Sequence, residues 1–214
     1  MNATGDSIVV YVEGGGRSDR LRREQREAFA RFFEKTSLGA MRRPRVVACG
    51  ARASAFDSFK TAMSQGKAAI LLVDSEGTIA PENQLVSEPP TRWRPWAHLQ
   101  GRDGWTQPPE STDQDCHLMT QCMESWLIAD WQAVGNYFGN GFAPKHRPSG
   151  ACEGVPKSEV YGALKKATKD CKPKGPYQKG RDSFKLLRLV DPELICAASP
   201  WARRFMVELE GRKP

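Results

Sequence analysis

The stretch SIVVYVEGGG, residues 7–16, decides how this sequence folds. Its first six residues are rich in β-branched and apolar side chains, which is typical of a buried strand. Glu13 and three glycines follow, and glycines favour a turn. From Ser18, a residue type that caps helices, apolar residues recur at helical spacing as far as Gly39. The first unit of the fold is therefore a strand, a glycine turn and a helix.

The same order of elements then repeats. Residues 45–49, RVVAC, form a second predicted strand that ends at Gly50, and residues 54–64 form a second short helix. Residues 68–73, AAILLV, are continuously apolar, as expected for a strand covered by helices on both faces of its sheet. The sequence thus predicts the α/β fold class, with a Rossmannoid parallel sheet built on a βαβαβ core.

The chain changes in character after this core, which covers about residues 7–77. Residues 78–115 are rich in proline and carry Trp93, Trp96 and Trp105. We expect them to form an ordered insertion or lid that packs on the domain beside the active site, with a disordered linker as the alternative.

The remaining residues, about 116–214, are predicted to be mainly helical. One apolar stripe starts at Cys116, and Asp130 is expected to cap its continuation to Gly139. Three more helices are predicted at about 158–169, 181–190 and 199–210. A length of 214 residues fits one domain that contains all of these parts.

Composition and charge narrow the classes of function. The apolar runs are far shorter than the roughly 20 residues of a membrane span, no leader opens the chain, and the six cysteines lack zinc-site spacing. We therefore expect a cytoplasmic protein with reduced thiols.

The formal charge is +7, and residues 157–185 hold nine basic against three acidic residues, a local excess of 9 − 3 = +6. Such a surface attracts nucleic acid, although a solvated helix face gives the same pattern.

Acidic residues stand at the ends of two predicted strands. Glu13 ends the first, and Asp74 and Glu76 follow the third. The carboxyl ends of parallel strands meet at one edge of the sheet, and Asp74 and Glu76 leave on the same side if the strand continues. We expect the three carboxylates to gather around Mg²⁺, with Mn²⁺ as an alternative, because a hard divalent ion offsets their repulsion. Such a site suits phosphoryl transfer.

The sequence contains further candidate site residues, which we expect to act as a carboxylate or as contacts to phosphate and bases. Glu124 lies seven residues beyond His117, which places both on one face of the predicted helix. We expect Glu124 to be a fourth catalytic carboxylate and a ligand of a second metal ion, with a partly buried structural acid as the alternative. Arg52 follows the second strand and suits phosphate binding. Lys179 and Arg181 flank Tyr177 in KGPYQKGRDSF, a mixture suited to phosphate contact and base stacking. The predicted contacts to nucleic acid are Arg52, His117, Lys179 and Arg181, with His98 a weaker candidate.

The pairs Glu13-Gly14 and Asp74-Ser75-Glu76-Gly77 resemble the TOPRIM domain of topoisomerases, primases and overcoming-lysogenization-defect nucleases. That family has a strand ending in Glu-Gly and a later strand ending in Asp-x-Asp, so glutamate at position 76 departs from its pattern. By resemblance, Glu13 is a general acid/base or metal ligand, and Asp74 and Glu76 bind Mg²⁺. The segments VYVEGGG, ACGAR, LLVDSEG and QCMESWLIAD are similar to a family of small bacterial TOPRIM-like proteins of unassigned function.

The resemblance implies a Mg²⁺-dependent nuclease that cleaves DNA or RNA. It also implies an anti-phage defence role beside an ABC- or AAA-type ATPase partner, in which the chain could assemble as an oligomer. The alternative is a non-catalytic TOPRIM module that binds nucleic acid or regulates the ATPase. A topoisomerase is not expected, because the sequence has neither the length for strand-passage domains nor an identifiable tyrosine module, and it lacks the zinc-binding motif of a primase.

Overall fold

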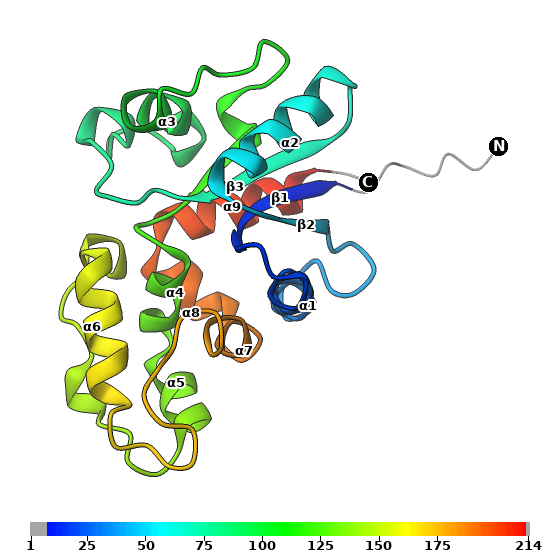
Figure 1. Cartoon of the computed structure of the whole chain (residues 1–214). Helices are drawn as coiled ribbons and strands as arrows, with labels where there is room; N and C mark the ends of the chain where they lie inside the picture. Colours follow the sequence, from blue (N-terminus) through cyan, green and yellow to red (C-terminus); the bar gives the residue numbers. More distant parts are fainter. Residues whose placement is uncertain (1–7, 213–214) are drawn as a thin grey trace.

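Four parallel strands form the sheet at the centre of the molecule, in the order β2-β1-β3-β4 (Figure 1). The chain is described by a computed structural model over residues 8–212. The strands are β1 (Val9–Gly15), β2 (Arg45–Gly50), β3 (Ala69–Asp74) and β4 (Cys116–Met119). Each neighbouring pair runs parallel. The predicted α/β class and the three strands of its core are confirmed.

The side chains of the central strands alternate between two hydrophobic cores, one on each face of the sheet. In β3, Ile70 and Leu72 belong to one hydrophobic core, whereas Leu71 and Val73 belong to the other. Successive side chains of a strand point to opposite faces, so a strand covered on both sides is apolar throughout. All six residues of β3 are buried for this reason.

The first two helices cover opposite faces of the sheet (Figure 1). Helix α1 (Asp19–Glu34) packs Phe29 and Phe33 against the face that carries Ile70. Its N-cap is Ser18, whose Oγ accepts a hydrogen bond from the backbone N–H of Leu21, as the sequence predicted. Helix α2 (Arg52–Ser64) covers the other face.

The insertion after β3 is ordered, so the alternative of a disordered linker is wrong. It contains short 3₁₀ turns and helix α3 (Pro95–Asp103). Trp93 and Trp96 are buried in the same core as α2, and the indole N–H of Trp96 donates to the carbonyl oxygen of Thr112 at 2.9 Å. These tryptophans hold the insertion on the sheet.

Six α-helices follow β4 within the described residues: α4 (Met123–Ala129), α5 (Trp131–Phe138), α6 (Lys157–Ala167), α7 (Ser183–Leu187), α8 (Pro192–Ala198) and α9 (Pro200–Gly211). Helices α4–α8 gather on the side of α1 (Figure 1), and α9 packs against β4. Asp130 caps α5 as predicted, because its Oδ1 accepts from the N–H of Ala133. The sequence did not predict α8. Within residues 8–212, no helix has both the length and the apolar character needed to cross a membrane.

The helix predicted to begin at Cys116 is wrong, because residues 116–119 form β4 and the helix starts only at Met123. All four residues of β4 are buried, so the strand shows no alternation of polar and apolar side chains. Its apolar residues, followed by those of α4, imitate a single helical stripe.

His117 consequently lies inside the protein. Its side chain is buried, its Nε2 donates to the carbonyl oxygen of Gln114 at 2.9 Å, and its Nδ1 accepts from Arg204 at 3.0 Å. Burial, reinforced by the guanidinium of Arg204, holds the pKa of His117 well below its ordinary value. The prediction that His117 contacts nucleic acid is therefore wrong, because the side chain has no exposed surface and pairs with α9.

Candidate metal centre

Glu13, Asp74 and Glu76 meet at the carboxyl edge of the sheet, and we call these three residues the acid cluster. Glu13 lies on β1 and Asp74 ends β3, which are neighbouring strands. The chain leaves β1 towards β2 and leaves β3 towards β4, so the strand order switches at this point. One carboxylate oxygen from each of the three residues lies within 4.8 Å of the others. The predicted convergence is confirmed.

Glu76 reaches the cluster by a different route from the one predicted. The strand ends at Asp74, and Glu76 has a left-handed backbone conformation with φ of 64°. Its N–H donates to the carbonyl oxygen of Gln121 at 2.9 Å, which fixes the loop against the segment before α4. A turn, and not a continued strand, therefore brings its carboxylate beside that of Asp74.

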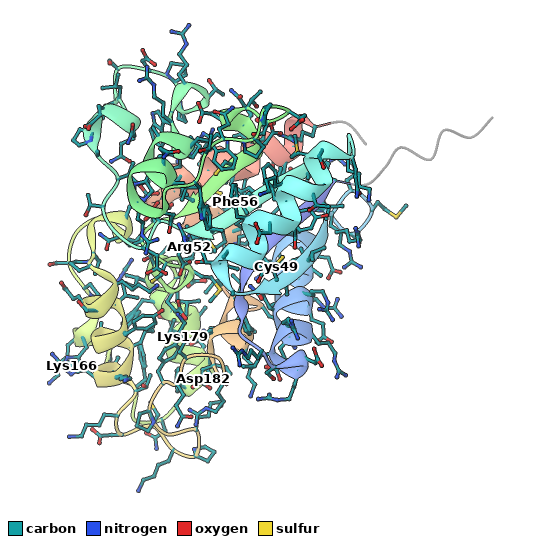
Figure 2. The ribbon with its side chains drawn as sticks, turned by 45° about the horizontal axis from the view of Figure 1, so that its top comes forward. Cys49, Arg52, Phe56, Lys166, Lys179 and Asp182 are labelled. Atoms are coloured by element: carbon teal, nitrogen blue, oxygen red, sulfur yellow. The ribbon has the colours of Figure 1, made fainter. Side chains whose placement is uncertain are left out.

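Arg52 ties the cluster to the insertion. Its Nη1 lies 3.2 Å from Oε2 of Glu13 and also donates to the backbone carbonyl of Asp74. Its Nε and Nη2 bind the two oxygens of Asp103 at 3.1 and 2.8 Å, and its guanidinium lies 5.0 Å from the ring centre of Trp105. Figure 2 shows Arg52 at the start of α2. Its location is as predicted, but the chain's own acids already occupy the donors that were expected to bind phosphate.

The insertion also supports the loop that carries Glu76. His98 of α3 donates from Nε2 to the carbonyl oxygen of Ser75 at 2.9 Å. Phe56 of α2 stacks on Trp105 with ring centres 4.5 Å apart, which anchors the segment after α3 beside Arg52. The insertion therefore packs beside the acid cluster, and His98 acts there as a support for the backbone.

Lys157, which the sequence analysis counted only as part of a basic run, provides the second cation. Its Nζ lies 2.6 Å from Oε1 of Glu76 and 3.4 Å from Oδ2 of Asp74. Lys157 is the first residue of α6, where the helix dipole disfavours a positive charge. The two carboxylates, and not the helix, therefore account for its position.

The charges within the cluster are unequally stabilised. Burial raises the pKa of Asp74 well above its ordinary value, and the nearby carboxylates of Glu13 and Glu124 raise it further. For Glu76, burial acts in the same direction, but the hydrogen bond and charge of Lys157 outweigh it and lower the pKa. The ionised form is thus disfavoured at Asp74 and favoured at Glu76.

Glu124 lies near the cluster, but hydroxyl groups surround its carboxylate. Its Oε2 accepts from Tyr161 at 2.9 Å, and its Oε1 accepts from Tyr177 at 3.1 Å and from Ser183 at 3.0 Å. Burial and the charge of Glu124 raise the pKa of both tyrosines, so both phenols remain donors. Glu124 therefore fixes the loop of residues 177–183, and its predicted place on one helix face with His117 is wrong.

In the basic loop before α7, one of the predicted contact residues is exposed and two are held by contacts within the protein. Lys179 is exposed, lines the cavity described below and lies 5.1 Å from the ring centre of Tyr161 (Figure 2). Arg181 instead binds Asp182 at 2.7 Å and the backbone carbonyl of Pro176 at 2.9 Å. Tyr177 is 1% exposed, so the predicted base stacking by this residue is wrong.

A cavity of about 440 Å³ opens onto the acid cluster. It is bounded by the glycine turn after β1, by the start of α1, by the ends of β2, β3 and β4, by α4 and by the loop before α7. Its lining residues are Glu13, Gly14, Gly15, Gly16, Arg17, Ser18, Leu21, Gln25, Gly50, Asp74, Glu76, Met119, Met123, Glu124, Lys179, Gly180, Ser183 and Phe184. A ligand that fills this cavity contacts the cluster directly.

The donor set of the cluster fits a hard divalent ion. Carboxylate oxygens are the ligands that Mg²⁺ and Mn²⁺ prefer, and each residue of the cluster offers at least one oxygen at the shared point. Lys157 now supplies the positive charge at Asp74 and Glu76. A divalent ion and this ammonium therefore compete for the same oxygens.

Replacing Lys157 with methionine is expected to tighten the binding of Mn²⁺ by about tenfold, because the competing ammonium is gone. The variant should also unfold at a lower temperature without divalent ions, since the carboxylates then face one another uncompensated. Isothermal titration with Mn²⁺ and thermal unfolding measure the two effects.

Lys166→Met is the matched control, because Lys166 is exposed on the same helix and lies away from the cluster (Figure 2). This substitution should leave the affinity for Mn²⁺ within about twofold of the original value. Equal or weaker binding of Mn²⁺ by Lys157→Met would show that the ion and the lysine do not share these oxygens.

Comparison with known proteins gave one family match. A family model described as "Domain of unknown function (DUF4276)" matches residues 12–210, a range that contains the acid cluster, the insertion and the helices through most of α9. Neither the curated proteins nor the solved structures contained a match to the chain. The family description assigns no activity, and the TOPRIM resemblance stays a prediction. Because the match spans most of the sequence, the chain belongs to the DUF4276 family.

Proposed function

We propose that this protein is a Mg²⁺-dependent enzyme that cleaves phosphodiester bonds in DNA or RNA. The observation that carries the proposal is the acid cluster, in which an oxygen from each of three carboxylates lies within 4.8 Å of the others at the switch in strand order. Burial and neighbouring carboxylates make the ionised form of Asp74 unfavourable. A bound divalent ion would offset this repulsion, and strained charges of this kind are common at functional sites.

The ion, when bound, supplies Lewis-acid chemistry that polarises a phosphoryl group and lowers the pKa of a coordinated water. Glu13, Asp74 and Glu76 would hold it. Glu13 is fixed by the N–H of Asp74 at 2.8 Å and by Arg52, so its carboxylate keeps one orientation towards the cavity. A carboxylate held in this way beside the substrate is suited to accept or return a proton.

Positive charge supports a nucleic-acid substrate. The net charge of +7 favours association with a polyanion through counterion release. Lys179 and Arg17 both line the cavity beside the cluster and are exposed, so they are the side chains that we propose for phosphate contacts. Arg181 is not among them, because Asp182 and backbone carbonyls occupy its guanidinium.

The TOPRIM resemblance extends this proposal to a biological setting. Proteins with that domain include nucleases of bacterial defence systems that work beside an ABC- or AAA-type ATPase. We propose the same cytoplasmic role and an ATPase partner for this protein, on the strength of the Glu13-Gly14 and Asp74-x-Glu76 pattern.

A non-catalytic module that binds nucleic acid or regulates an ATPase is the second candidate. One observation favours it: every carboxylate of the cluster already has a cationic partner, with Arg52 on Glu13 and Lys157 on Asp74 and Glu76. An ion-pair network of this kind also serves to hold a fold together.

Cleavage separates the two candidates. The purified protein with Mg²⁺ or Mn²⁺ is expected to cut DNA or RNA, and Asp74→Asn should reduce the rate at least about 100-fold because one ion ligand loses its charge. The asparagine retains an oxygen for the N–H of Met123, which Asp74 binds at 2.8 Å, so the fold should persist. Gel assays and circular dichroism measure the two quantities.

Asp57→Asn is the control for this substitution, because Asp57 is exposed on α2 and its carboxylate lies 3.9 Å from Lys60, outside the acid cluster. Its cleavage rate should match that of the unmodified protein. Undiminished cleavage by Asp74→Asn would remove Asp74 from the mechanism. If no DNA or RNA is cut even with an ATPase partner present, the non-catalytic candidate replaces the enzyme.

Stability against pH gives an independent test. The folded-state pKa of Asp74 is raised, so its ionised form is less favourable in the folded than in the unfolded protein, and stability falls as pH rises from near 3.8 through the raised value. Without divalent ions, Asp74→Asn should therefore unfold at a higher temperature than the unmodified protein at pH 7, by about 2–4 °C per kcal/mol relieved. This advantage should vanish near pH 4. Lower stability of the variant at pH 7 would mean that the Asp74 ion pair is structural, which favours the non-catalytic candidate.

A further inference from the structure

The cavity beside the acid cluster is much larger than the cluster needs to bind an ion. Its volume of about 440 Å³ falls within the range of small-molecule sites, roughly 300–1,000 Å³. Four apolar side chains from different elements line it: Leu21 of α1, Met119 of β4, Met123 of α4 and Phe184 of α7. The same space therefore has a charged part and an apolar part.

Gln25, a lining residue of this cavity, has a buried hydrogen-bond acceptor without a partner among the described residues. Its side chain is 1% exposed, and its Nε2 donates to the backbone carbonyl of Glu13 at 2.6 Å. That contact identifies the nitrogen, because a carbonyl oxygen accepts only from a donor, and leaves Oε1 without a partner. A buried acceptor without a partner costs free energy, which a ligand N–H or O–H would recover.

Two cationic side chains of the cavity lining are exposed to solvent. Lys179 and Arg17 are exposed lining residues, and the capped N-terminus of α1 begins between Arg17 and Leu21. The N–H groups of a first helical turn lack partners within the helix and favour a negative ligand group. With an ion at the acid cluster, these groups favour a phosphate within the cavity.

The apolar wall is held in a fixed position. Ser183, the residue before Phe184, donates to Glu124 at 3.0 Å, and its hydroxyl oxygen lies 2.7 Å from that of Tyr177. Glu124 is therefore a positioning residue, whose buried carboxylate sets the loop that carries Lys179 and Phe184. A preformed wall binds a rigid ligand without first having to become ordered.

We propose that the cavity binds one unpaired nucleotide, with its phosphate at the acid cluster and its base against Leu21, Met123 and Phe184. Gln25 Oε1 accepts a hydrogen bond from the base or the sugar. A hydrocarbon chain would leave Gln25 without a donor, and a phosphosugar would leave Phe184 and the methionines without an apolar partner. This inference rests on the proposed function and names its substrate class.

A base in this cavity is unstacked and unpaired, because its face lies on Phe184 and its edge on Gln25. A base inside a duplex meets neither condition unless it leaves the stack. The preferred substrate is therefore a single-stranded or frayed end, or an unpaired position, of DNA or RNA.

Binding without cleavage tests the inference. In Ca²⁺, which replaces Mg²⁺ without supporting turnover in many phosphoryl-transfer sites, titration calorimetry compares the four common nucleoside 5′-monophosphates with inorganic phosphate. At least one monophosphate should bind about tenfold or more tightly than inorganic phosphate. Phe184→Leu should weaken that monophosphate at least about fivefold while leaving inorganic phosphate unchanged, because only the base loses its stacking partner.

Phe142→Leu is the control, because Phe142 packs on Trp131 away from the cavity lining. It should leave both affinities unchanged, whereas a general loss of folding would weaken both ligands together. Monophosphates that bind no more tightly than inorganic phosphate, or that are indifferent to Phe184→Leu, overturn the proposal.

Competition identifies the source of the nucleotide. A short single-stranded oligonucleotide should displace the bound monophosphate, and a duplex closed at both ends by covalent hairpins with paired stems should compete at least about tenfold less well. Equal competition by the two, or none by the oligonucleotide, contradicts an unpaired nucleic-acid substrate. No bond is cut in these binding assays, so their outcome is separate from that of the cleavage assay. Nucleotide binding by a protein that cleaves no DNA or RNA would overturn the proposed function alone. Cleavage by a protein that does not prefer nucleotides to inorganic phosphate would overturn this inference alone.

Discussion

Repulsion among three carboxylates at one edge of a parallel sheet is the constraint on which the rest of the structure depends. Oxygens of Glu13, Asp74 and Glu76 approach within 4.8 Å of one another, and Asp74 is buried. Charges this close in a partly desolvated site require nearby positive charge. The protein provides Arg52 from α2, which Asp103 of the insertion holds, and Lys157 from α6. The βαβαβ core therefore depends on both later parts of the chain to compensate its acid cluster.

The insertion and the helical part therefore have distinct tasks. Asp103 of the insertion holds Arg52 through two hydrogen bonds, so that one cation stays in place as a permanent part of the site. Lys157 binds through a single flexible side chain at the start of α6, and an incoming ion can displace it. Glu124 then fixes the loop that closes the other side of the cavity.

The fold and the acid cluster could be predicted because strand periodicity is local and parallel strands share a carboxyl edge. Strand β4 could not, since four buried residues followed by an apolar helix imitate one helix. Lys157 lies 81 residues beyond Glu76 in the chain, and no local pattern links the two. The predicted roles of His117 and Tyr177 failed for a related reason, because sequence spacing does not report which side chains a fold buries.

A structure of the protein crystallised with saturating Mn²⁺ tests the central claim most directly, because the anomalous signal of the metal locates it without reference to activity. The account predicts one ion about 2.1 Å from oxygens of Glu13 and Asp74. It also predicts that the Lys157 ammonium has moved away from both Asp74 and Glu76. A map with no metal at the acid cluster, and with Lys157 still paired to Glu76, would contradict it.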